Sequence, residues 1–262
     1  MDFIFYIIAG AGVGLVVGLT GVGGGSLMTP LLILSGIPEK IAIGTDLLYA
    51  SITKTGAMAT HMRQGTVRWR LVGWLAAGSI PASVATSFVI KRYVPADLDY
   101  GHTLSQALGV MLILTAIVVF FRRRIQGEDH DVNISWMHKR ANTITFIAGV
   151  FLGVFVTLSS VGAGAFCAAL LMWLYPRLPA INVVGTDISH AVPLTLIAGL
   201  GHLWNGNVDF QLLGGLLIGS LPAVYVGTKA GAKVPNSILQ PILAMILLVI
   251  GIRFAFFASS GH

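Results

Sequence analysis

The chain has 262 residues, of which 55% are hydrophobic and only 10% are charged, and its formal net charge is +6. Soluble domains carry about 25% charged residues, so this composition excludes an ordinary water-soluble globule. No charged residue occurs between Phe3 and Pro38 or between Ala141 and Pro176. Because a bilayer core about 30 Å thick is crossed by about 20 apolar helical residues, we expect an all-α, polytopic membrane protein.

The apolar stretches predict five helical segments in each half of the chain. In the first half they lie at about 3–19, 26–36, 39–62, 67–91 and 102–121. In the second half they lie at about 141–158, 164–175, 180–203, 208–231 and 236–258. The second segment of each half is too short to cross a bilayer, and it follows a glycine-rich break. Broken backbone at membrane depth is tolerated only inside the protein or along a cavity, so we expect a short, broken helix in each half.

The two halves repeat one another. Gly44-Thr45-Asp46 returns 141 residues later as Gly185-Thr186-Asp187, and the same shift carries His61 onto His202. It also carries Gly78-Ser79-Ile80-Pro81 onto Gly219-Ser220-Leu221-Pro222. Agreement at several spaced polar and glycine positions indicates a duplication. We therefore predict a first transmembrane repeat at 1–121, a linker at 122–140 and a second transmembrane repeat at 141–262.

Basic residues predict the orientation of the repeats. The linker holds five of them, namely Arg122, Arg123, Arg124, Lys139 and Arg140, and the positive-inside rule places it in the cytoplasm. The turn at 63–70 carries three arginines, whereas its repeat mate at 203–209 carries no basic residue. Equivalent turns then lie on opposite sides of the membrane, which predicts inverted-topology repeats. Because the positive charge belongs to these loops, and no Cys/His set has metal-ligand spacing, we expect no nucleic acid, metal or cofactor.

Inverted repeats with paired broken helices are typical of alternating-access transporters, whose site lies near the membrane midplane. A helix N-terminus after a glycine turn presents free N–H groups and the positive end of the helix dipole, which suits an anion. Each half offers such an N-terminus, near Ser26 and near Ala165. Nearby hydroxyl groups are candidate donors to an oxyanion or, alternatively, contacts between packed helices: Thr45, Thr186, Ser159 and Ser160.

Two acidic residues, Asp46 and Asp187, lie at equivalent positions inside apolar segments. An acid at membrane depth costs about 2.5–3.5 kcal/mol on insertion scales and marks a functional site by default. Since removal from water favours the protonated form of a carboxylate, both are candidate proton carriers. The alternative is that each belongs to the start of its helix.

Lys54 follows Asp46 by eight residues, and its repeat mate is Thr195. Its charge could hold an anion or pair with Asp46. Three histidines, His61, His190 and His202, are candidate proton shuttles or simple packing contacts. The single cysteine, Cys167, is interpreted as a small apolar residue.

The glycine-rich block and the residues around Asp46 resemble those of a known family. The block from Gly18 to Leu32, with Gly44-Thr45-Asp46-Leu47 and the stretch from His61 to Val67, resembles the TauE/SafE sulfite exporter family over nearly the whole chain. The resemblance implies a bacterial or archaeal inner-membrane permease for sulfite, sulfoacetate or a related organosulfonate, coupled to protons. It also implies an anion site made of glycine loops and threonine segments, here Gly23, Gly24, Gly25, Ser26, Thr45, Gly162, Gly164 and Thr186.

Many members of that family have a small hydroxyl residue where this chain has Asp46 and Asp187, which favours direct proton coupling here. Our hypothesis is a proton-coupled carrier in which Lys54, Ser160 and the helix N-termini hold the anion. Its partners would be a small sulfur-containing anion, protons and the lipid bilayer, and a homodimer stays open. The alternatives are an anion channel or uniporter and an intramembrane aspartyl protease, although this chain has Gly-Thr-Asp rather than the G-x-G-D pattern of such proteases.

Overall fold

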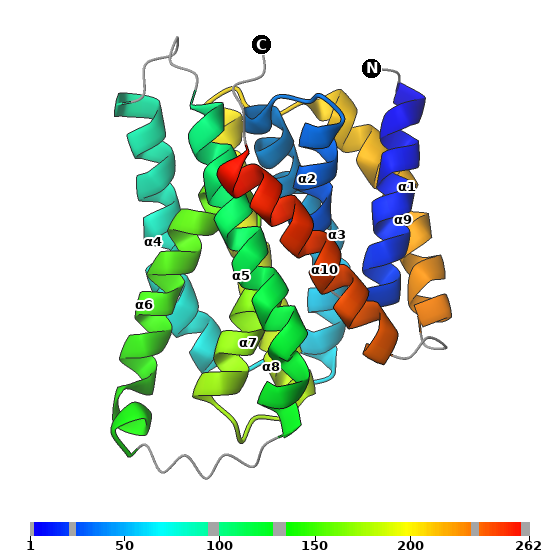
Figure 1. The fold of residues 1–262 in the computed structure, drawn as a ribbon. Coiled ribbons are helices and arrows are strands. Elements are labelled where there is room, and N and C mark those ends of the chain that lie inside the picture. Colours follow the sequence, from blue (N-terminus) through cyan, green and yellow to red (C-terminus); the bar gives the residue numbers. More distant parts are fainter. Residues whose placement is uncertain (1–2, 21–24, 94–99, 128–134, 232–235, 258–262) are drawn as a thin grey trace.

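The computed structural model describes residues 3–20, 25–93, 100–127, 135–231 and 236–257, which form ten helices and contain no strand (Figure 1). In chain order they are α1 (Phe3–Thr20), α2 (Gly25–Leu34), α3 (Glu39–Arg63), α4 (Trp69–Tyr93), α5 (Gly101–Gly127), α6 (Ser135–Ser159), α7 (Ala165–Leu174), α8 (Ala180–Trp204), α9 (Phe210–Gly231) and α10 (Asn236–Phe256). The predicted all-α fold is confirmed, and α2 and α7, with 10 residues each, are the two short helices.

Five helices, α4, α5, α6, α8 and α9, are long and apolar enough to cross a membrane by length and composition. The 25-residue α3 is not among them, and it contains five charged residues, Glu39, Lys40, Asp46, Lys54 and Arg63. Its stretch from Ala42 to Ser51 is buried against other helices, so its surface there does not meet lipid and need not be apolar. The fold is that of a multi-pass membrane protein.

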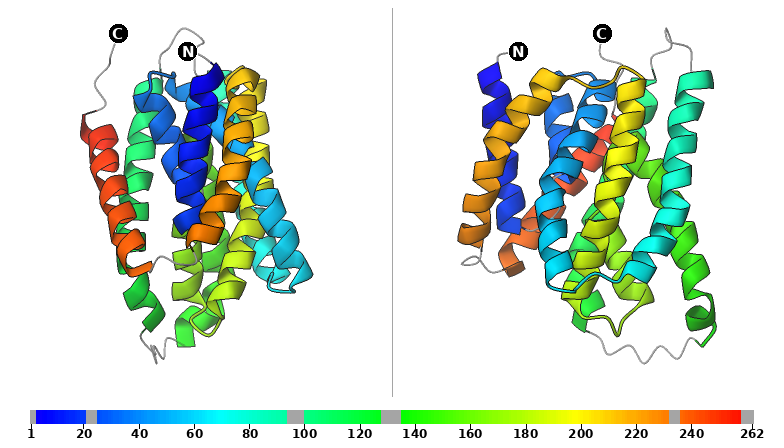
Figure 2. Two further views of the ribbon diagram at one scale, coloured as in Figure 1. Left: turned by 90° about the vertical axis from the view of Figure 1, so that its right-hand side faces the viewer. Right: turned by 180° about the vertical axis from the view of Figure 1, so that it is seen from behind.

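The helices pack in pairs that join the two halves of the chain. α3 packs on α8 in the middle, α6 packs on α4, α1 packs on α9, and α5 packs on α10. Figures 1 and 2 show the α4–α6 and α1–α9 pairs on opposite sides of the molecule. α1, α3 and α5 run in one direction, and their predicted mates α6, α8 and α10 run in the other. The inverted repeat remains a prediction from the sequence, and these directions support it.

Two glycines allow the two central helices, α3 and α8, to pack closely against the other half of the chain. A Cβ atom on Gly44 in α3 would collide with the carbonyl oxygen of Asn207, in the turn after α8. A Cβ atom on Gly185 in α8 would meet Thr66 and His61, at the turn after α3. Each central helix therefore lies directly against the turn of the other half.

The threonine that follows each glycine supports the same contact. Thr45 Oγ1 accepts a hydrogen bond from the backbone N–H of Asp209 at 3.1 Å, and Thr186 Oγ1 accepts one from the N–H of Arg68 at 3.0 Å. Asp209 and Arg68 directly precede α9 and α4, where backbone N–H groups have no partner within their own helix. Each threonine thus joins a central helix, α3 or α8, by a hydrogen bond to the beginning of α9 or α4.

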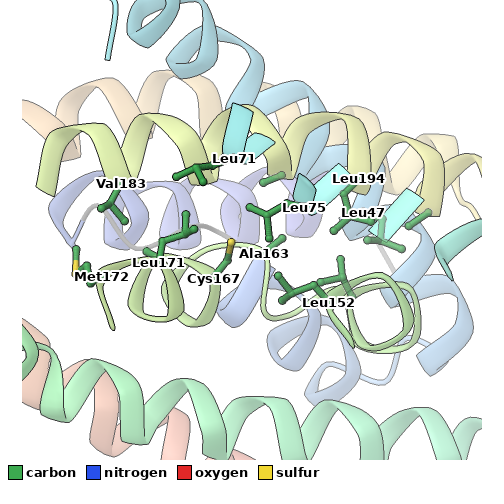
Figure 3. Packing of buried hydrophobic residues seen from close by; sticks show 14 of the residues in the cluster. Leu47, Leu71, Leu75, Leu152, Ala163, Cys167, Leu171, Met172, Val183 and Leu194 are labelled. Carbon is green, nitrogen blue, oxygen red and sulfur yellow. The ribbon is translucent and has the colours of Figure 1, made fainter. Parts of the chain in front are cut away.

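An apolar cluster fills the space between α3, α4, α6, α7 and α8 (Figure 3). It includes Leu47, Leu75, Leu152, Leu171 and Leu194, each fully buried. Cys167 of α7 is fully buried in the same cluster. The cluster lies beside the charged groups of the centre.

A Gly44→Ala substitution tests whether the α3 contact determines the stability of the fold. Because the added methyl group would meet backbone, which cannot rotate away, we expect overpacking to cost about 1–3 kcal/mol. The melting temperature of the protein purified in detergent should fall. Gly73→Ala is the matched control, since its Cβ atom would meet nothing within 4 Å. Equal melting temperatures for the two variants would contradict the role assigned to Gly44.

Candidate functional site

The carboxylate of Asp46 joins three separate elements of the chain. Asp46 belongs to α3 and is fully buried. Its Oδ2 atom accepts hydrogen bonds from Thr29 Oγ1 of α2 at 2.5 Å and from Ser160 Oγ, between α6 and α7, at 2.9 Å. Its Oδ1 atom is buried and has no hydrogen-bond partner among the described residues. The carboxylate thus connects the first half of the chain to the second and keeps one oxygen for another donor.

The break between α6 and α7 has the backbone that its sequence predicts. Gly162 has a φ of 112°, which a side chain would rarely adopt, and Ser160 has a φ of 60°. The Ser159 hydroxyl accepts a hydrogen bond from the N–H of Val161 and so stabilises the turn. Gly164 precedes α7 without any side-chain hydrogen bond to cap that helix. The first N–H groups of α7 are thus not occupied by a capping side chain.

Lys54 lies beside this break. Its Nζ atom donates a hydrogen bond to the carbonyl oxygen of Ala163 at 2.7 Å, one residue before Gly164. The ammonium group also interacts electrostatically with both Asp187 and Asp46. The ammonium group therefore lies within electrostatic range of one carboxylate from each half, at the N-terminal end of α7.

Asp187 and His190 form the part of the site that α8 provides. Asp187 is 5% exposed, and its side chain interacts with the Cys167 thiol. His190 lies one helical turn further along and is fully buried, with Nε2 at 2.8 Å from Ser79 Oγ of α4. His190 also interacts electrostatically with Lys54. Asp46, Asp187, His190, Lys54 and Ser160 are thus the predicted residues that the structure brings together.

Other predicted site residues lie away from this centre or hold structural contacts. Thr45 and Thr186 bond to the starts of outer helices, as described above. His61 Nδ1 lies 2.9 Å from Thr66 Oγ1, and His202 Nε2 lies 2.8 Å from the Thr157 carbonyl oxygen. Gly162 and Gly164 shape the break before α7. Gly23 and Gly24 lie outside the described residues, and Gly25 and Ser26 are described only as the first residues of α2.

Sequence reasoning assigned no role to Thr29 or Ser79, although each hydrogen-bonds a central polar residue. The sequence contained one signal for Ser79, because the repeat of Gly78-Ser79-Ile80-Pro81 as Gly219-Ser220-Leu221-Pro222 includes a serine in both halves. Tyr49, the repeat mate of His190, correspondingly lies beside Ser220. Thr29 has no such signal, since only the packing of α2 on α3 brings it to Asp46.

Comparisons with known proteins agree on one class of protein. The family model described as "Sulfite exporter TauE/SafE" matches residues 6–254. The chain is 39% identical over 250 residues to the "Probable membrane transporter protein YjnA" of Bacillus subtilis, covering 94% of this chain and 97% of that protein. It is 30% identical to YdhB of the same organism, covering 93% and 96%, and 27% identical to MJ0441 of Methanocaldococcus jannaschii, covering 94% and 92%.

No solved structure gives a significant match to this chain. The names of the three relatives describe membrane transporters. The family match covers nearly the whole chain, including both halves and the centre described above. The chain is therefore a membrane transporter that belongs to the TauE/SafE sulfite exporter family.

Proposed function

We propose that this chain is a proton-coupled carrier of the cytoplasmic membrane that moves a small sulfur oxyanion such as sulfite, sulfoacetate or another organosulfonate. One observation carries the proposal. The centre of the fold holds one ammonium group and two carboxylates, which interact electrostatically beside the start of α7, where no side chain caps the helix.

Lys54 and α7 are the groups that would hold the anion. The present acceptor of the Lys54 ammonium group is the neutral carbonyl of Ala163. An oxyanion would be a stronger acceptor, because hydrogen bonds between charged groups are roughly twice as strong as neutral ones. The N-terminus of α7 would add N–H donors and a favourable dipole to the same anion. Ser160 could donate a further hydrogen bond if it released Asp46.

The balance of charge supports coupling to protons. With both carboxylates ionised and His190 neutral, Lys54, Asp46 and Asp187 leave the centre with a net negative charge. An anion entering this centre meets repulsion that burial makes stronger than in water. Protonation of one carboxylate removes that repulsion, so the proton and the anion favour each other's binding. This mutual effect is the thermodynamic basis of coupled transport.

The bonds of Asp46 suggest how the proton would affect the conformation. The ionised carboxylate holds Thr29 of the first half and Ser160 of the second. A protonated carboxyl group accepts weaker hydrogen bonds, so its protonation would loosen this connection between the halves. Rocking of one half against the other would then expose the centre alternately to each side. The basic linker at 122–140 would face the cytoplasm.

The anion site is tested by a Lys54→Met variant, which keeps the length of the side chain and removes its charge. Because a hydrogen bond to a charged group contributes about 1.5–3 kcal/mol, we expect the apparent affinity for sulfite to fall about ten- to hundredfold. The measurement is the concentration dependence of radiolabelled sulfite uptake by proteoliposomes.

Lys40→Met is the matched control, because Lys40 lies in the first turn of the same helix and over the Tyr100 ring, 4.2 Å from its centroid. It should keep an affinity close to that of the wild type. Unchanged affinity in the Lys54→Met variant would remove Lys54 from the anion site. An equal decrease in both variants would mean that the site responds only to the overall charge.

Proton coupling is tested with Asp46→Asn and Asp187→Asn, because asparagine is similar in shape to a carboxyl group but cannot take up or release a proton. Proteoliposomes containing a pH dye receive sulfite, sulfoacetate or sulfate outside. We expect acidification that depends on the anion in the wild type and its loss in at least one of the two variants. Glu39→Gln, at the first residue of α3, should keep it.

Protein-free vesicles provide the correction in this experiment, since protonated sulfite species cross lipid by themselves. Labelled anion flux without any protein-dependent proton movement would contradict proton coupling. The protein would then be a uniporter or a channel, and both aspartates would have structural roles.

A further inference from the structure

A line of buried polar side chains leads along α4 from His190, which lies one helical turn after Asp187 on α8. Ser79, Ser83 and Ser87 lie one turn apart on the same face of this helix, and each is at most 5% exposed. A transmembrane helix that packs against other helices needs small residues at such positions, but it does not need hydroxyl groups. The partners of the three serines show what these groups contact.

The partners come from α6 and α8. His190 Nε2 lies 2.8 Å from Ser79 Oγ, and the hydroxyl groups of Ser83 and Thr157 are hydrogen-bonded at 2.7 Å. Thr157 is linked in turn to His202, whose Nε2 atom lies 2.8 Å from its carbonyl oxygen. Because a carbonyl oxygen can only accept, His202 Nε2 carries the proton and its Nδ1 atom is then an acceptor in the neutral ring.

The line reaches the membrane face at which α4 and α8 end. Asn205, half-buried in the turn after α8, donates hydrogen bonds to the carbonyl oxygens of Gly201 and, at 3.5 Å, Ser87. Gly201 has no Cβ atom, which leaves room for the Ser87 hydroxyl. This face is opposite the one at which α5 ends and α6 begins (Figure 2). By the predicted orientation it is the outer face.

Three polar atoms along the line have no hydrogen-bond partner among the described residues: His190 Nδ1, His202 Nδ1 and Ser87 Oγ. All three are buried, and a buried polar group without a partner costs free energy. Water molecules or moving protons would satisfy them. These atoms are the second observation, besides the serines, that indicates a polar route rather than packing alone.

The equivalent contact in the other half of the protein lacks this line. The repeat mates of Ser79, Ser83 and Ser87 in α9 are Ser220, Val224 and Thr228, and Thr228 is exposed. The mate of Thr157 is Gly18, whose missing side chain lets α1 approach the backbone of α9. The hydrogen-bonded hydroxyl pair of Ser83 and Thr157 thus has no equivalent between α1 and α9, where its mates are Val224 and Gly18.

We propose that His190, Ser79, Ser83, Thr157, His202 and Ser87 form a proton pathway between Asp187 and the face at which α8 ends. The inference rests on the proposed function and names Asp187 as the acid that exchanges protons with the outside. Hydroxyl and imidazole groups can each accept and donate a hydrogen bond, so a proton can pass along them. The Thr157 carbonyl oxygen only orients the His202 ring, and water would carry the proton between the serines and to the Nδ1 atom of His202. His190 faces Lys54 of α3 and Ser79 of α4, and His202 faces the Thr157 carbonyl of α6.

The test interrupts the middle of the pathway with Ser83→Ala and, separately, Thr157→Val, which removes a hydroxyl group and keeps the shape. Proteoliposomes report three quantities: proton uptake driven by sulfite, net uptake of radiolabelled sulfite, and exchange of labelled for unlabelled sulfite at equal pH. Exchange does not require the carrier to release its proton. We therefore expect proton uptake and net uptake to fall about tenfold or more, while exchange stays within about twofold of the wild type.

Ser220→Ala is the matched control, because Ser220 is the buried repeat mate of Ser79 in the other half. It should keep all three rates. A second variant, His202→Gln, which retains a donor for the Thr157 carbonyl but cannot relay a proton, should behave like Ser83→Ala.

The outcomes separate this inference from the proposed function. Normal sulfite-driven proton uptake in Ser83→Ala, Thr157→Val and His202→Gln would overturn the pathway and leave the carrier proton-coupled. Equal loss of exchange and net uptake would also overturn it, because the side chains would then be structural. If the wild-type protein moved sulfite without moving protons, the proposed proton coupling would be contradicted, and the pathway with it. Loss of coupling in Asp46→Asn but not in Asp187→Asn would contradict the role of Asp187.

Discussion

The direct contact between each central helix and the turn of the other half is the constraint on which this fold depends. Gly44 and Gly185 permit it because a side chain there would meet the opposite turn. The threonines that follow them bond to the starts of α9 and α4. With α3 and α8 held in this way, Asp46 and Asp187 cannot turn towards lipid. One tripeptide motif therefore provides a close contact, a hydrogen bond to a helix start and a buried acid in three successive residues.

A second consequence is that charge in the centre belongs to both halves at once. The Asp46 carboxylate is bonded to a residue of each half, and Lys54 of the first half reaches the backbone before α7 in the second. Any change in the charge of these groups alters the contacts between the halves. In a transporter whose halves move relative to each other, binding and motion would then depend on the same few atoms.

The repeats are equivalent in packing and different in chemistry. Lys54 corresponds to Thr195, His190 to Tyr49, and Thr157 to Gly18. Helix contacts tolerate these exchanges because each position still fits its neighbours, whereas Lys54 occurs only in the first half, and His190 and Thr157 occur only in the second. If the proposed function holds, two similar halves would provide one anion site and one route for protons, because these side chains differ between the halves.

The sequence by itself determined the membrane-spanning class, the ten helices with two short ones, and the buried acids, because hydropathy, glycine breaks and repeats are local or periodic signals. It also indicated Lys54 and Ser160 as candidate site residues, which stays a prediction, since polar residues at membrane depth are conspicuous. Only the tertiary structure decided that Thr45 and Thr186 bond to helix starts, that Thr29 reaches Asp46, and that Ser79 and Ser83 of α4 meet His190 and Thr157. These contacts depend on the rotation and depth at which distant helices pack, which the pattern along one segment does not specify.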